Sequence, residues 1–71
     1  MSDITYEITK HIGVISTSAK KWTTEVNLIS WNGNPAKIDI RDWAPGKEKM
    51  GKGITLTEEQ ARELGKLLKD I

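Results

Sequence analysis

The chain has 71 residues, which suffices for one packed domain, so we assign residues 1–71 to a single domain. Hydrophobic residues make up 37% and charged residues 30% of the composition, and no apolar run exceeds two residues; this excludes a disordered chain and predicts neither a membrane span nor a signal peptide. The net charge is +1, but residues 10–52 carry eight Lys or Arg against four acidic residues, which is compatible with a polyanionic partner without identifying one.

Four β-rich runs come first in the chain. They cover residues 4–14, 22–31, 36–43 and 54–56. Asn32-Gly33 predicts a turn with positive φ between the second and third runs. A lysine-rich loop over residues 44–52 precedes the short fourth run.

The last third of the chain predicts a helix over residues 58–70. Thr57 and Gln60 form a capping box, in which each side chain bonds to the backbone N–H of the other residue. One apolar stripe follows at helical spacing: Ala61, Leu64, Leu67, Leu68 and Ile71. The expected fold class is α+β, a four-stranded antiparallel meander followed by one C-terminal helix (ββββα). Because so short a chain has a marginal core, we expect it to pack as a homodimer.

Neither an enzyme nor a cofactor or metal site is predicted. Cysteine is absent and histidine occurs once, which excludes disulfides and the common Cys/His zinc sites, and no known catalytic motif is present. His11 is expected at the surface, with a binding or pH-sensing role as the alternative. Asp39 and Asp42 alternate onto opposite faces of a strand, which excludes an acid–base pair, and both are expected to be solvated. Small secreted domains usually carry disulfides, so we expect a cytoplasmic location.

The third run carries the most informative residues. Its apolar side is expected to lie under the helix, and its outward side carries Lys37, Arg41 and Trp43, with Trp31 beside them on the neighbouring strand. Exposed tryptophans among basic residues favour a binding surface. Bases stack on aromatic rings while Lys and Arg hold phosphates, and only single strands offer free base faces, so the pattern favours single-stranded nucleic acid.

Other roles remain open for the same aromatic residues. A second subunit or the N-terminal strand would cover Trp31 and Trp43 if these rings are structural. Trp22 falls at a strand end, where it belongs either to the core or to its rim. For the lysines of the 47–52 loop, ordinary solvation is the expected role.

Three consecutive segments of the chain resemble a known family. They are Ile38 to Trp43 (IDIRDW), the Pro/Gly/Lys loop that follows, and Lys52 to Leu56, which leads into the helix cap. This is the transcriptional positive-cofactor family, the single-stranded-DNA-binding domain of a eukaryotic transcriptional coactivator, and the chain is most similar to its short bacterial members of the YdbC type. The resemblance extends over residues 26–71. It implies four antiparallel strands and a helix, a homodimer, and single-stranded DNA running over the strand faces.

The resemblance also implies roles for individual residues. It assigns a contact with the DNA backbone to Arg41, base stacking to Trp43 and Trp31, and a basic contact to Lys52. The chain departs from the eukaryotic members in two places: Asn32 and Asn34 replace lysines in a longer turn, and the 44–51 loop is shorter. Both departures imply weaker or differently placed DNA contacts.

These observations predict a sequence-tolerant single-stranded-DNA-binding protein that serves transcription regulation, replication or repair. The expected nucleic-acid-binding residues are Lys20, Lys21, Trp22, Trp31, Lys37, Arg41, Trp43 and Lys52. Two alternatives use the same face: an adaptor that docks a protein of the transcription machinery, and RNA binding, which stacking does not distinguish from DNA binding.

Overall fold

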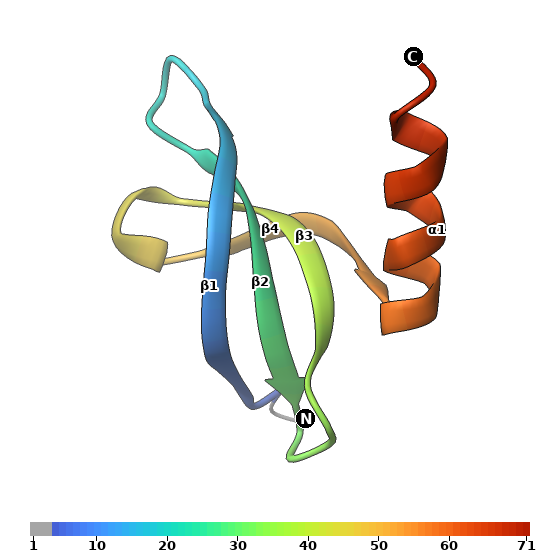
Figure 1. The fold of residues 1–71 in the computed structure, drawn as a ribbon. Helices are drawn as coiled ribbons and strands as arrows, with labels where there is room; N and C mark the ends of the chain where they lie inside the picture. The colour runs from blue at the N-terminus through green and yellow to red at the C-terminus, as the bar shows by residue number, and fades with distance from the viewer. Residues whose placement is uncertain (1–3) are drawn as a thin grey trace.

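The computed structural model describes residues 4–71, which form four strands followed by one helix (Figure 1). The elements are β1 (Tyr6–Thr17), β2 (Thr23–Trp31), β3 (Lys37–Trp43), a 3₁₀ turn (Pro45–Lys47), β4 (Met50–Leu56) and α1 (Glu58–Leu68). The strands form one antiparallel sheet in the order β1-β2-β3-β4. The predicted meander with a C-terminal helix is confirmed.

Strand β4 is longer than predicted. It begins at Met50 rather than at Ile54, because Met50 pairs with Trp43 and Gly53 pairs with Arg41 across the sheet. Two glycines and a lysine weaken the local strand pattern there, and pairing with β3 overrides it. The lysine-rich loop is correspondingly shorter.

The turn between β2 and β3 has the predicted conformation. Asn32 and Gly33 have φ angles of 50° and 77°. The N–H of Asn34 donates to the carbonyl of Trp31 at 2.9 Å and closes the turn. This turn sets the register in which Ile29 faces Lys37.

Strand β1 is irregular, because its pairing with β2 shifts at three places. Each β-bulge adds a residue on one strand and turns the following side chains to the other face. Tyr6 therefore pairs with Trp31, whereas Ile12 lies with Leu28 and Ile38 on the opposite side of the sheet.

The two faces of the sheet differ in chemistry. On one, which we call the tryptophan face, β2 and β3 place Glu25, Asn27, Ile29, Trp31, Lys37, Asp39, Arg41 and Trp43. Among residues 4–71, the fully buried side chains are Trp43, Ile29, Asn27 and Asp39. The core of the single chain is therefore on this face, and half of its fully buried residues are polar.

The opposite face, which we call the aliphatic face, carries Val26, Leu28, Ile38, Ile40 and Leu56. All five side chains are only partly covered. Together they make an apolar surface that one chain leaves accessible to water.

Helix α1 begins at the predicted capping box. The N–H of Gln60 donates to Thr57 Oγ1 at 3.1 Å, and the N–H of Thr57 donates to Gln60 Oε1 at 3.0 Å. The helix ends at Leu68 rather than at Asp70. In the described part of the chain, no helix is long and apolar enough to cross a membrane.

The helix does not cover the sheet of its own chain. None of its residues is buried, and it stands beside the sheet with its largest contacts at β3 and β4 (Figure 1). The prediction that it lies over one face is wrong, because the single residue Thr57 joins it to β4 and it does not fold back. Its apolar stripe is partly covered at Ala61 and Leu64 and exposed at Leu67, Leu68 and Ile71.

Gly53 allows the backbone of β4 to approach β3. A Cβ at this position would lie 2.5 Å from Arg41 Cβ and 2.6 Å from the carbonyl oxygen of Ile40. Overpacking of this kind costs about 1–3 kcal/mol, so we expect Gly53→Ala to lower the free energy of unfolding in urea by about that amount. Gly13→Ala is the control, because nothing lies within 4 Å of its added Cβ. Equal losses in the two variants would contradict this account.

Candidate nucleic-acid interface

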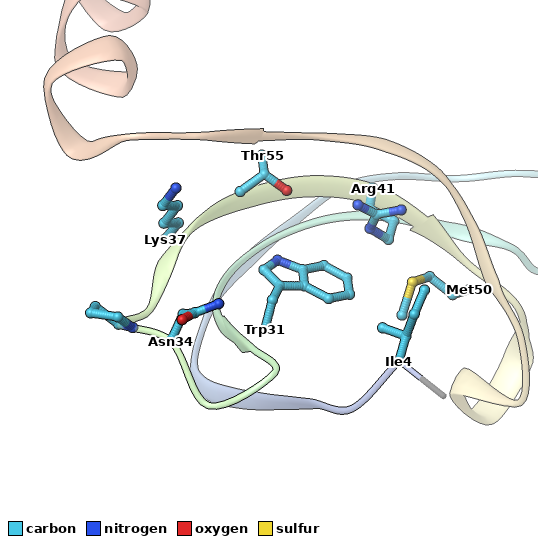
Figure 2. A pocket seen from close by; sticks show the side chains of 8 residues that line it. Ile4, Trp31, Asn34, Lys37, Arg41, Met50 and Thr55 are labelled. Carbon is cyan, nitrogen blue, oxygen red and sulfur yellow. The ribbon is translucent and has the colours of Figure 1, made fainter. Parts of the chain in front are cut away.

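A cavity of about 650 Å³ opens on the tryptophan face beside the turn that joins β2 to β3 (Figure 2). It is lined by Ile4, Trp31, Asn34, Pro35, Lys37, Arg41, Met50 and Thr55. Figure 2 shows the indole of Trp31 in the middle, with Lys37 toward one end and Met50 toward the other. The cavity thus unites three predicted site residues, Trp31, Lys37 and Arg41, and its volume is typical of sites that accept a small organic group.

Trp31 ends β2, and its side chain is only partly covered. The ring of Tyr6 lies opposite on β1, with centroids 5.8 Å apart. The guanidinium carbon of Arg41 is 5.1 Å from the centroid of the Trp31 ring. Among residues 4–71, no hydrogen-bond partner reaches the buried indole Nε1, so the accessible part of Trp31 offers apolar ring surface rather than a donor.

Trp43 lies on the same face, as alternation predicts, but it is 0% exposed. The ring of Tyr6 is 5.7 Å from its ring, and Lys47 Nζ is 5.8 Å from its centroid. The prediction that Trp43 is exposed is wrong. Tyr6 belongs to β1 and Lys47 to the 3₁₀ turn after β3, so these two segments lie against the Trp43 ring. For this ring, cover by the N-terminal strand is the alternative that holds.

Arg41 is held by a buried carboxylate. Its Nε and Nη2 donate to the two oxygens of Asp39 at 2.9 and 3.0 Å, and its Nη1 donates to the carbonyl of Gly51 at 3.0 Å. Thr55 Oγ1 donates to Asp39 Oδ1 at 3.1 Å. The prediction that Asp39 is solvated is wrong, because it is 0% exposed and balances the guanidinium in a bidentate pair.

A second buried carboxylate, that of Glu25, lies on the neighbouring strand β2. Lys47 Nζ is 3.0 Å from Glu25 Oε1, Thr23 Oγ1 donates to Oε2 at 2.7 Å, and Asn27 Nδ2 donates to Oε1 at 3.3 Å. His11 Nδ1 donates to Asn27 Oδ1 at 2.7 Å, since that oxygen can only accept. His11 is at the surface, as predicted, whereas Lys47 is tied to Glu25 instead of being simply solvated.

The surroundings of Glu25 lower its pKa. Burial alone raises the pKa of this carboxyl, but hydrogen bonds from Thr23, Lys47 and Asn27 and the charge of Lys47 together hold it below its ordinary value. A carboxyl whose pKa is lower in the folded state stabilises the fold above its unfolded-state pKa. That stabilisation is lost as the pH falls through the folded-state pKa.

We therefore expect Glu25→Gln to be less stable than the unsubstituted protein at pH 7. The difference should shrink as the pH falls below about 4, where the carboxyl of the unsubstituted protein takes up its proton. Urea denaturation of both proteins across this range measures the difference. A difference in unfolding free energy that is constant with pH would contradict the account.

The remaining predicted site residues lie outside the cavity. Lys20 and Lys21 are exposed at the tip of the β1–β2 hairpin, and Lys21 has a φ of 71°. Trp22 packs against Gly51, since its Cζ3 lies 3.0 Å from where a Cβ on that glycine would be. Lys52 is exposed on the outer strand β4. The structure therefore does not place Trp22 or these lysines beside Trp31.

Several residues of the site are not predicted from the sequence. Met50 and Thr55 complete the cavity from β4, and Ile4 and Asn34 complete it from segments outside the strands. A sequence signal existed only for Thr55, which alternates with the apolar Ile54 and Leu56 of the predicted fourth run and so falls on the other face of the sheet. Among residues 4–71, no group of three His, Cys, Asp or Glu side chains is arranged to hold a metal ion.

Two comparisons relate the chain to known proteins. The sequence profile of the family described as Transcriptional Coactivator p15 (PC4) matches residues 18–67, a range that contains all the predicted site residues. A protein of Treponema pallidum (strain Nichols), described only as uncharacterized, is 52% identical over 66 residues. That similarity covers 93% of this chain and 78% of the relative.

Proposed function

The chain belongs to the transcriptional coactivator p15 (PC4) family, and from this membership and the cavity around Trp31 we propose that it binds single-stranded DNA with little sequence preference. The family is nucleic-acid-binding and non-enzymatic, with a coactivator-like role. In our proposal a base stacks on the accessible part of Trp31, Lys37 contacts a phosphate, and the complex serves transcription, replication or repair.

The observation that carries this proposal is that one cavity holds an accessible indole together with a cation that has no acidic partner among residues 4–71. Trp31 and Lys37 both line it, and within residues 4–71 Lys37 forms no ion pair. An apolar ring surface stacks on any base, which accounts for sequence tolerance. Lys20, Lys21 and Lys52 are also exposed, and in our proposal they contact phosphates outside the cavity.

Tryptophan fluorescence during titration tests the proposal. A dT oligomer should quench the emission, whereas the matching duplex should not, because its base faces are covered. Affinity for the oligomer should fall with salt, with a log–log slope of about −0.7 for each phosphate contact. Absence of quenching by either ligand would contradict the proposal and favour docking of a protein partner on this face; an oligo-U titration shows whether RNA competes.

We also propose that two copies associate through the aliphatic face and α1. Hydrophobic side chains buried within residues 4–71 of one chain are limited to Ile29, Trp43 and Ala44. Leu67 and Leu68 on the helix are 62% and 52% exposed. A second copy would cover both apolar surfaces and supply the core that so short a chain lacks.

Sedimentation equilibrium measures the association directly. We expect twice the chain mass of 8.0 kDa. Leu67→Glu introduces a charge into the apolar stripe and should shift the equilibrium to single chains, whereas Lys66→Glu, on the exposed polar side of the same helix, should not. A single-chain mass for the unsubstituted protein at micromolar concentration would contradict the proposed dimer.

A further inference from the structure

The two tryptophans of the tryptophan face share an arrangement. Each has a cation near its ring, and each cation is paired with a buried carboxylate. Arg41 lies 5.1 Å from the ring centroid of Trp31 and pairs with Asp39, while Lys47 lies 5.8 Å from that of Trp43 and pairs with a buried glutamate. The positive charge beside each ring is therefore balanced inside the protein.

Arg41 is the more completely held of the two cations. Its side chain is 14% exposed, and three of its five N–H donors are used within the chain, on Asp39 and on the carbonyl of Gly51. Asp39 is in turn fixed by Thr55. Bonds from Thr55 through Asp39 thus set the position of the guanidinium plane relative to Trp31.

Lys37 lines the same cavity as Arg41 but is not held in this way. It is exposed, and within residues 4–71 it has no carboxylate partner. A phosphate at the cavity would therefore meet a free positive charge at Lys37 and an already neutralised one at Arg41. A neutralised pair contributes little to counterion release.

We propose that Arg41 is a positioning residue, an inference that rests on the proposed binding of single-stranded DNA. It holds the indole of Trp31 in the orientation that accepts a base, through stacking of a planar guanidinium that Asp39 keeps in place. Contact with phosphate falls to Lys37. This differs from the contact with the DNA backbone that family resemblance implies for Arg41.

A double-mutant cycle on dT binding tests the proposal. Arg41→Gln should weaken binding by about 2- to 30-fold in the protein that retains Trp31. In the Trp31→Ala background the same change should have almost no further effect, because a residue that acts only through Trp31 loses its role with that ring. An equal loss in both backgrounds would overturn the proposal.

The salt dependence supplies a readout that damage to the fold would not produce. Arg41→Gln should leave the log–log slope unchanged, whereas Lys37→Gln should make it shallower by about 0.7. A slope that becomes shallower by that amount in Arg41→Gln would show a phosphate contact and overturn the proposal. Circular dichroism and urea denaturation verify that each variant is folded.

Arg41→Lys decides the question if Arg41→Gln does not fold. Lysine keeps the charge but lacks the planar fork that pairs with Asp39 and stacks on Trp31. We expect Arg41→Lys to bind as weakly as Arg41→Gln, and recovery of full affinity would overturn the positioning role. If the unsubstituted protein does not bind the oligomer at all, the proposed function itself fails, and the two failures are thereby distinguished.

Discussion

Replacement of Trp31 by alanine is expected to weaken binding to a dT oligomer by about 1–3 kcal/mol, or roughly 5- to 150-fold in Kd. Trp31 is the accessible aromatic ring of the cavity, and alanine removes the surface on which a base stacks. The fold should survive, because the ring is only partly covered. Fluorescence anisotropy of a labelled oligomer at fixed salt measures the loss.

Two controls separate stacking from other effects of this substitution. Trp31→Phe keeps an aromatic face and should retain most of the affinity. The unfolding midpoint of Trp31→Ala in urea should stay close to that of the unsubstituted protein. Unchanged affinity in Trp31→Ala would remove Trp31 from the binding mechanism.

Replacement of Trp43 by alanine is expected to act on stability, with a loss of about 3–5 kcal/mol in the free energy of unfolding. Trp43 is fully buried beneath Tyr6 and Lys47, so the substitution leaves a cavity in a very small core. Native domains are stable by only about 5–15 kcal/mol, so a loss of this size should lower the urea unfolding midpoint markedly. Urea denaturation at one protein concentration measures the change.

Trp43→Phe is the matched control for this effect. The Nε1 of Trp43 is buried and has no hydrogen-bond partner in the part of the chain that the structure describes, so phenylalanine loses volume but no hydrogen bond seen there. We expect it to be more stable than Trp43→Ala and to bind dT as the unsubstituted protein does. A Trp43→Ala protein with an unchanged unfolding midpoint but lost DNA binding would show instead that Trp43 contacts the strand.

Local patterns in the sequence were sufficient to predict the element order. The capping box at Thr57 and Gln60 and the Asn32-Gly33 turn are short-range signals, and both have the predicted geometry. Membership of the family, inferred from residues 38–56 and the helix cap, is confirmed by the profile match. These features depend on neighbours in the chain, which a single sequence displays.

Exposure was not predictable in the same way. Alternation correctly places Asp39, Arg41 and Trp43 on one face, but whether that face is open depends on what curls over it. Bulges in β1 bring Tyr6 over Trp43, and no local pattern marks them. The helix position likewise depends on packing that one chain does not supply.

The most direct test of the account is ¹⁹F NMR of protein labelled with 5-fluorotryptophan, titrated with a dT oligomer. Trp22, Trp31 and Trp43 should each give one resonance, assigned by single substitution to phenylalanine. We expect the Trp31 resonance to shift on binding and the Trp22 and Trp43 resonances to stay nearly in place. A shift confined to Trp43 or Trp22, with Trp31 unmoved, would contradict stacking in the Trp31 cavity.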